Sequence, residues 1–199
     1  MKTDLVVAVY NENLAWLRNR KFDNEKVFAY AKFERFDFDF VEKLPNIGRE
    51  SHTYIWHILK NYEKIESDYT LFLQGDPFVH ISSKMDSVSN CIFNNNYDLK
   101  HLFYPLGGAV ICDAMGKPFS NWDCKIYRIW DELFCYDMPQ YFVANYGAQQ
   151  IVHKSLIAHR SKKFWEKALD LHYEYESAAP WAFEILWNYV FDPRFISAY

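Results

Sequence analysis

The sequence has no long apolar segment. An apolar run near the start covers residues 5–10, and the polar residues Asn11, Glu12 and Asn13 follow it at once. A membrane-spanning helix needs about 20 consecutive apolar residues, and the core of a signal peptide is also longer than this run. We therefore expect a soluble, cytoplasmic chain without a transmembrane segment. Peripheral contact with a membrane surface is left open.

The chain also lacks a block of basic residues. It contains 22 Lys and Arg against 26 Asp and Glu, and its formal net charge is −4. Proteins that bind nucleic acids carry a basic patch or stripe as their electrostatic footprint. The composition therefore predicts no nucleic-acid partner, and a tightly bound anion would have to be met by a few local cations.

Cysteines are few and widely spaced. The four residues Cys91, Cys112, Cys124 and Cys135 include no CxxC pair. This spacing is typical neither of a zinc site nor of a dense secreted disulfide scaffold. The histidines likewise form no HExxH motif. Reduced thiols in a cytosol-like compartment are the expectation.

Apolar and aromatic residues, by contrast, are abundant. Half of the residues are hydrophobic and 20% are aromatic, so the chain can bury a substantial core. No repeat, low-complexity tract or Pro/Gly-rich linker divides it. We therefore expect one domain that covers residues 1–199, with most of its aromatic side chains in the core.

Predicted strands alternate with predicted helices along the chain. The predicted strands cover residues 4–10, 26–32, 69–74, two short runs within 101–113, and 147–153. The predicted helices cover residues 49–62, 125–135, 162–173 and 180–191. This order predicts an α/β domain whose central sheet is mainly parallel and partly mixed, flanked by helices.

Polar residues follow three of the predicted strands. Asn11 and Glu12 come after the first, Lys32 ends the second, and Gly75 and Asp76 follow the third. In open α/β sheets, ligands bind in the crevice outside the carboxyl ends of the strands. The pattern predicts that Asp76 points into such a crevice. The alternative is that its Gly-Asp-Pro setting is an ordinary turn.

These residue types suit a phosphate ligand held with a metal ion. A hard dication binds carboxylate oxygens and retains positions for other ligands, so Asp76 together with a diphosphate can hold it. Arg49 opens the predicted helix 49–62, where a fork of N–H donors would add to the helix N-terminus. The alternative for Arg49 is a surface ion pair with Glu50.

Five segments, in order along the chain, carry a resemblance to a known family. They are VVAVYNENLAWL (6–17), LPNIGRESHTYIWHI (44–58), FLQGDPFVH (72–80), GAQQIVHKSLI (147–157) and PWAFEILWNYVF (180–191). The sequence resembles a family of small GT-A-type glycosyltransferases of bacteria, fungi and large DNA viruses, formerly grouped as a domain of unknown function. It is also similar to a small chlorella-virus glycosyltransferase domain.

The resemblance implies a single GT-A-like, Rossmann-like domain and a nucleotide-sugar donor, with a uridine diphosphate sugar expected. It implies that the donor site includes Tyr10, Asn11, Gln74, Gly75 and Asp76, and the positions of Lys32 and Arg49 at the predicted crevice add these two cations to the expected donor site. It further implies that Trp181 and Gln149 contact the sugar or a glycan acceptor. These assignments are expectations.

The acidic motif of the family departs from its usual form here. GT-A enzymes usually carry Asp-x-Asp, whose carboxylates hold Mn²⁺ or Mg²⁺ against the diphosphate. This chain has Asp76-Pro77-Phe78, so the second aspartate is missing. His80 could replace it, since imidazole suits Mn²⁺ better than Mg²⁺, which makes Mn²⁺ the expected metal; a structural role for His80 is the alternative.

A transfer reaction also needs a carboxylate that accepts the proton of the attacking hydroxyl. We expect Glu184 in this role, because it lies inside a helix opened by Pro180 and near Trp181. A salt bridge from Glu184 to Arg194 is the alternative. Other candidates are Asp113, Asp131 and Asp192. Because a single residue is assigned as the base, we expect the reaction to invert the configuration at the anomeric carbon.

Three functions are open at this stage. The first is a metal-dependent glycosyltransferase that moves a sugar from a nucleotide-diphosphate donor to a hydroxyl acceptor. The second is a glycoside hydrolase, which also uses paired carboxylates. The third is a nucleotide-binding module without catalysis, since the second aspartate is absent.

Overall fold

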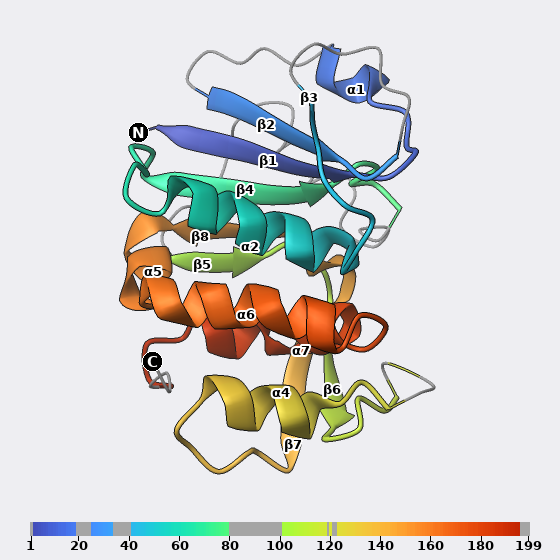
Figure 1. Cartoon of the computed structure of the whole chain (residues 1–199), viewed down its shortest axis with the longest axis vertical. Helices are drawn as coiled ribbons and strands as arrows, with labels where there is room; N and C mark the ends of the chain where they lie inside the picture. Colours follow the sequence, from blue (N-terminus) through green and yellow to red (C-terminus); the bar gives the residue numbers. More distant parts are fainter. Residues whose placement is uncertain are drawn as a thin grey trace.

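A six-stranded sheet runs through the upper part of the molecule, and a two-stranded sheet lies toward the opposite end (Figure 1). The computed structural model describes residues 2–18, 25–33, 41–79, 101–118, 120 and 123–195. In spatial order the large sheet contains β3 (Val41–Lys43), β2 (Glu25–Ala31), β1 (Thr3–Val9), β4 (Tyr69–Gln74), β8 (Gln150–His153) and β5 (Phe103–Pro105). The small sheet pairs β6 (Ala109–Asp113) with β7 (Tyr141–Asn145).

The large sheet is mainly parallel, as predicted. The first four strands in this order run parallel, whereas β8 is antiparallel to both β4 and β5. Strand β1 is central, and nearly all of its side chains are buried. A parallel strand covered on both faces requires such an uninterrupted apolar run. The prediction of a mainly parallel, partly mixed α/β sheet is confirmed.

Most of the described helices cover one face of the large sheet and join it to the small sheet, whereas the first, α1 (Ala15–Arg18), packs on the opposite face. The others are α2 (Arg49–Asn61), α4 (Ile126–Leu133), α5 (Lys154–His159), α6 (Lys162–Glu174) and α7 (Ala179–Val190), with a 3₁₀ turn η1 at Tyr146–Ala148. Figure 1 shows α2 in front of the sheet and α6 and α7 beside it. Alternate residues of β1 therefore face different clusters: Val6 and Ala8 pack with these helices, whereas Leu5, Val7 and Val9 pack with α1.

Most predicted elements lie within a few residues of the observed ones. The largest difference is at residues 147–153, where the strand begins only at Gln150. Gly147 (φ 84°) and Ala148 (φ 46°) are in the left-handed region, so η1 interrupts the expected strand. The sequence pattern also missed α1, β3, β7 and α5, because elements this short carry little periodicity.

No helix in the described part of the chain is both long enough and apolar enough to cross a membrane.

The charged side chain of Arg160 is fully buried and holds the end of α7. Its Nε donates to the carbonyl of Val190 at 2.7 Å, and its Nη2 donates to the carbonyls of Tyr189 at 2.8 Å and Asp192 at 3.2 Å. Its Nη1 donates to the carbonyl of Phe195. Backbone carbonyls at a helix C-terminus lack intrahelical donors and carry partial negative charge, so this guanidinium satisfies them.

We expect Arg160→Met to lower the free energy of unfolding by about 3 kcal/mol or more, because buried carbonyls would lose their donors. Urea denaturation at neutral pH measures the effect. The matched control is Arg128→Met, since Arg128 is exposed on α4; its expected change is within about 0.5 kcal/mol. Equal stabilities for the two variants would contradict this account of Arg160.

Candidate functional site

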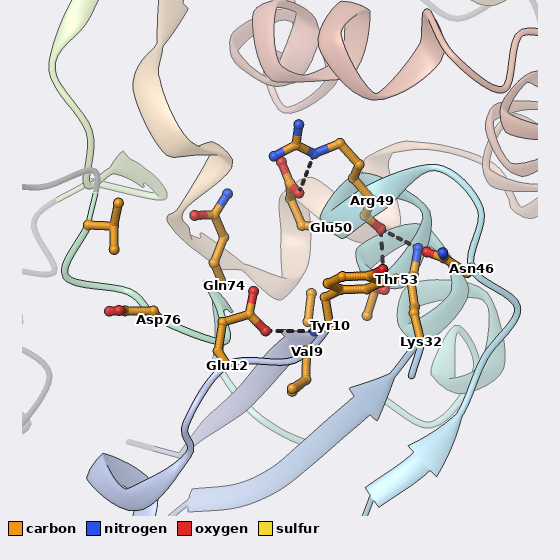
Figure 2. Close-up of a pocket in the computed structure, with 12 residues that line it drawn as sticks. Val9, Tyr10, Glu12, Lys32, Asn46, Arg49, Glu50, Thr53, Gln74 and Asp76 are labelled. Carbon is orange, nitrogen blue, oxygen red and sulfur yellow. Dashed lines mark hydrogen bonds and ion pairs between the residues drawn. The ribbon is translucent and has the colours of Figure 1, made fainter. Parts of the chain in front are cut away.

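A cavity of about 530 Å³ opens at the carboxyl ends of β1, β2 and β4, beside the N-terminus of α2 (Figure 2). The register explains the position, because Val9 pairs with Ala31 and Ala8 pairs with Gln74, so the three strands end together. The lining residues are Ala8, Val9, Tyr10, Glu12, Lys32, Asn46, Arg49, Glu50, Thr53, Gln74, Asp76 and Val79.

The structure brings together residues that the sequence placed at separate strand ends. Tyr10, Lys32, Arg49, Gln74 and Asp76 all line this one cavity. Of the other predicted donor residues, Asn11 and Gly75 are chain neighbours of lining residues. Whether these residues bind a nucleotide sugar stays a prediction.

The ring of Tyr10 lies at the rim of the cavity. It is 45% exposed and its centroid is 5.7 Å from that of Phe33, which is 47% exposed. The two rings follow β1 and β2, so both stand at the same edge of the sheet. An exposed ring beside a polar cavity can stack on a nucleobase or a sugar.

Lys32 is buried, and its ammonium group is bound to backbone. Its Nζ donates to the carbonyls of Ile47 and Arg49, at the start of α2. Burial lowers the pKa of Lys32 to about 7, although Glu50 opposes this shift. Lys32 therefore fastens the segment before α2 to the end of β2, and its donors are largely used by the protein itself.

Arg49 is held from both sides. Its Nε lies 3.5 Å from Oε2 of Glu50, and its guanidinium carbon lies 4.6 Å from the ring centroid of Trp181. The alternative of an Arg49–Glu50 ion pair is therefore observed, but the pair lines the cavity. Trp181 offers one ring face to Arg49, which places Trp181 behind the cation instead of directly in the cavity.

The site residues assigned from the sequence did not include two cavity carboxylates, Glu12 and Glu50, although Glu12 was placed at the end of the first predicted strand. Glu12 belongs to the same Tyr-Asn-Glu sequence as Tyr10, and Glu50 directly follows Arg49. Their positions in the sequence, close to Tyr10 and next to Arg49, were the signal that could have identified them. With Asp76, they make the cavity lining richer in carboxylates than in cations, since Lys32 and Arg49 are the lysine and arginine in it.

Glu184 is not among the residues that line the cavity. It is 8% exposed, and its Oε1 accepts a hydrogen bond from the backbone N–H of Gly147 at 2.6 Å. Burial raises the pKa of Glu184 to about 7, and the nearby charge of Glu50 adds to this effect. The expected alternative, a salt bridge to Arg194, is not observed, because Arg194 pairs with Asp192 at 2.5 Å.

The phenol of Tyr54 lies close to three of these carboxylates. It is fully buried, and its hydroxyl has no hydrogen-bond partner among the residues that the structure describes. Burial raises the pKa of Tyr54 well above its ordinary value, and the charges of Glu50, Glu184 and Glu12 raise it further. Tyr54 therefore remains a neutral hydroxyl beneath the cavity.

The structure shows Asp76 both in a turn and at the cavity, which are the two positions considered for it from the sequence. Its Oδ1 accepts from the backbone N–H of Phe78 at 3.1 Å, which is the expected turn, and its side chain also lines the cavity. The predicted second metal ligand, His80, lies outside the described residues. Within the described ranges, no three His, Cys, Asp or Glu side chains form a group that could hold a metal ion.

Gln149 connects the turn after β7 to the loop that contains Asp76. It is 1% exposed, and its Nε2 donates to the carbonyl of Pro77 at 3.0 Å. Its Oε1 has no partner in the part of the chain that the structure describes. Gln149 is therefore next to the Asp76 loop, although it does not line the cavity.

The other candidate bases lie elsewhere. Asp113 accepts from the backbone N–H groups of Met115 and Lys117 in a turn after β6, and Asp131 is exposed on α4. Asp192 is engaged with Arg194. None of the three lines the cavity, whereas Glu50 lines it and Glu184 interacts electrostatically with Glu50.

Comparisons of the chain with protein-family models, with curated proteins and with solved structures found no match. The functional proposals below therefore depend on the geometry and chemistry of the cavity and on the resemblance described above.

We expect Glu184 to make the protein less stable as the pH rises from about 4.5 to about 7. In this range the native state binds the proton of Glu184 more tightly than the unfolded chain does, so ionisation favours unfolding. Glu184→Gln retains an acceptor for Gly147 and cannot ionise. As the pH rises between these values, the unfolding free energy of this variant should therefore increase relative to that of wild type by on the order of 3 kcal/mol.

Urea denaturation of both proteins at pH 4.5, 5.5, 6.5 and 7.5 measures this difference. Glu166→Gln is the control, because Glu166 is exposed on α6 and should change stability little at any of these pH values. A Glu184→Gln curve that runs parallel to wild type would show that Glu184 titrates normally in the native protein.

Proposed function

We propose that this protein is a glycosyltransferase that moves a sugar from a nucleotide-diphosphate donor, expected to be a uridine diphosphate sugar, to a hydroxyl of a glycan or other acceptor. We further propose that its sheet is a GT-A-like variant of the Rossmann arrangement. The observation that supports this proposal is the single cavity at the carboxyl edge of parallel strands, where Tyr10, Arg49 and Asp76 come together from separate segments.

Each of these residues has a donor-binding role in the proposal. The exposed ring of Tyr10 stacks on the base, and the guanidinium of Arg49 binds phosphate oxygens. Arg49 lines the cavity, and its Nε lies 3.5 Å from Oε2 of Glu50. Lys32 contributes by fixing the start of α2, because its ammonium is already bound to Ile47 and Arg49 carbonyls.

A divalent cation, Mn²⁺ or Mg²⁺, fits the donor set of this cavity. Asp76 is the residue expected to hold it, together with oxygens of the diphosphate, because a hard dication accepts a single protein carboxylate when ligand oxygens complete its coordination. When bound, it would neutralise charge on the departing diphosphate. The excess of carboxylates over cations in the lining is consistent with this need.

Transfer requires a base on the acceptor side. In the proposed reaction the acceptor oxygen bonds to the anomeric carbon, the bond from that carbon to the phosphate oxygen breaks, and the electron pair leaves with the diphosphate. A carboxylate takes the acceptor proton. Glu184 remains a candidate, and Glu50 is a second one, because Glu50 lines the cavity whereas Glu184 is not among the lining residues.

One observation favours glycoside hydrolysis as a second candidate function. Glu50 and Glu184 are both buried and interact electrostatically, and the pKa of Glu184 is raised to about 7. Glycosidases commonly use one carboxylic acid as a general acid and a second carboxylate as base or nucleophile. Incubation with nitrophenyl glycosides separates the two functions, since a glycosyltransferase would leave simple glycosides intact.

We expect a screen of sugar nucleotides with Mn²⁺ or Mg²⁺ to identify a donor that this protein binds and slowly hydrolyses. Asp76→Ala should reduce the metal-dependent turnover of that donor roughly 10²-fold or more, because the charge on the leaving diphosphate would no longer be compensated. Release of nucleoside diphosphate is the readout. Asp131→Ala is the control and should retain turnover, because Asp131 is exposed on α4 and is not among the cavity-lining residues. Unchanged activity and metal dependence in Asp76→Ala would refute the role of Asp76.

The base is tested by comparing Glu50→Gln with Glu184→Gln. Each variant keeps hydrogen-bonding capacity but cannot accept a proton, so the base variant should bind the donor normally and lose transfer by roughly 10²-fold or more. Donor affinity by calorimetry and transfer by product analysis give the two quantities. If both variants retain near-normal transfer, neither carboxylate is the base.

A further inference from the structure

Two backbone N–H groups at the end of β1 converge on one carboxylate oxygen. Oε2 of Glu12 accepts from the N–H of Tyr10 at 2.7 Å and from the N–H of Asn11 at 3.1 Å. Figure 2 shows the side chain of Glu12 turned back toward Tyr10 at the cavity. Consecutive amides that point at one anionic oxygen form a concave anion-binding arrangement, often called a nest.

Gly75 provides the room for this carboxylate. A Cβ atom at position 75 would lie 2.5 Å from Oε2 of Glu12, which is closer than any non-bonded contact allows. The carboxylate therefore sits between the end of β1 and the loop after β4. This position is shared by the two strand ends that frame the cavity, next to Asp76.

Glu12 is held there mainly by these amides. No cation forms an ion pair with it among the described residues, and its Oε1 has no hydrogen-bond partner among them. The two residues that carry these amides, Tyr10 and Asn11, are exposed. A carboxylate held by one oxygen at an accessible position can exchange with another anionic oxygen without breaking an ion pair.

The charges of the cavity make such a subsite useful. Glu50 and Asp76 add negative charge to the lining, and the ammonium of Lys32 is bound to carbonyls. Apart from Arg49, the lining therefore offers an anionic ligand only neutral donors, such as Asn46 and Gln74, while Glu12 occupies the two amides. Removing Glu12 from them would expose two N–H donors and relieve one negative charge.

We propose that the N–H groups of Tyr10 and Asn11 form a subsite for one anionic oxygen of a phosphate-containing ligand, and that the carboxylate of Glu12 occupies it until the ligand binds. The ligand oxygen then accepts both hydrogen bonds, and Glu12 turns out of the nest. The choice of ligand class rests on the proposed function. The consequence is that Glu12 weakens phosphate binding by competing for the same two donors.

The experiment compares Glu12→Ala, Glu12→Gln and Asp76→Asn with wild type. Binding of inorganic pyrophosphate and of uridine diphosphate is measured by calorimetry in buffer with a chelator, so that no metal contributes. Glu12→Ala and Asp76→Asn each remove one negative charge from the cavity, but only the first also frees the two amides. Glu12→Gln removes the charge and leaves a weaker, neutral competitor.

We expect Glu12→Ala to bind pyrophosphate roughly 5-fold or more tighter than Asp76→Asn, because a hydrogen bond to a charged group contributes more than one to a neutral group. Glu12→Gln should lie between the two. In ¹⁵N-labelled protein, the amide signals of Tyr10 and Asn11 should shift on titration with pyrophosphate. If Glu12→Ala does not fold, as judged by circular dichroism, Glu12→Gln decides by the same comparison.

Two results would overturn the proposal. One is binding by the Glu12 variants that is no tighter than binding by Asp76→Asn, which would reduce the role of Glu12 to its charge. The other is the absence of pyrophosphate-dependent shifts at the Tyr10 and Asn11 amides. Tighter binding with the expected shifts, in a protein that transfers no sugar from any donor, would support the subsite and reject the glycosyltransferase function.

Discussion

The buried ammonium group of Lys32 is the interaction on which the shape of the candidate site depends. It joins the end of β2 to the carbonyls of Ile47 and Arg49, immediately before and within the first turn of α2. Gly48 (φ 63°) and Arg49 (φ 47°) adopt the left-handed conformation in this same segment. Because a non-glycine residue pays a steric cost there, a fixed anchor is needed to keep Arg49 and Glu50 at the cavity.

A second set of hydrogen bonds links the C-terminal helix to the same site. Glu184 on α7 accepts from Gly147, and two residues later Gln149 donates to the carbonyl of Pro77, beside Asp76. The turn between β7 and β8 is therefore held at both ends. Through it, the second half of the chain positions a loop that follows β4 and that carries a proposed ligand-binding acid.

The carboxylates of the cavity lining favour a ligand that is itself cationic or that binds together with a cation. The lining carries the carboxylates of Glu12, Glu50 and Asp76, whereas the Nζ of Lys32 donates to backbone carbonyls. A diphosphate alone would meet repulsion in such a cavity, since carboxylates in a partly buried site are poorly screened. A divalent cation and the release of the amides held by Glu12 are two separate ways to reverse that balance.

Much of the fold follows from local patterns in the sequence. The apolar run of β1, the helical spacing in α2 and the polar residues after β1, β2 and β4 were sufficient to predict a mainly parallel sheet with a crevice at its carboxyl edge. Periodicity over seven or more residues is a strong signal, whereas β3 and α1 were too short to show one. The strand expected at residues 147–153 started late, because the left-handed turn at Gly147 has no periodic signature.

The sequence by itself determined which residue types stand at the strand ends, because chain order and alternation of apolar and polar residues set where each strand stops. Tertiary structure alone decided what each side chain does there. Lys32 donates to backbone carbonyls, Trp181 lies against Arg49, and Glu184 accepts from the backbone of Gly147. These outcomes depend on contacts between residues far apart in the chain and on the cost of burying charge, which is set by neighbours that the local sequence does not specify.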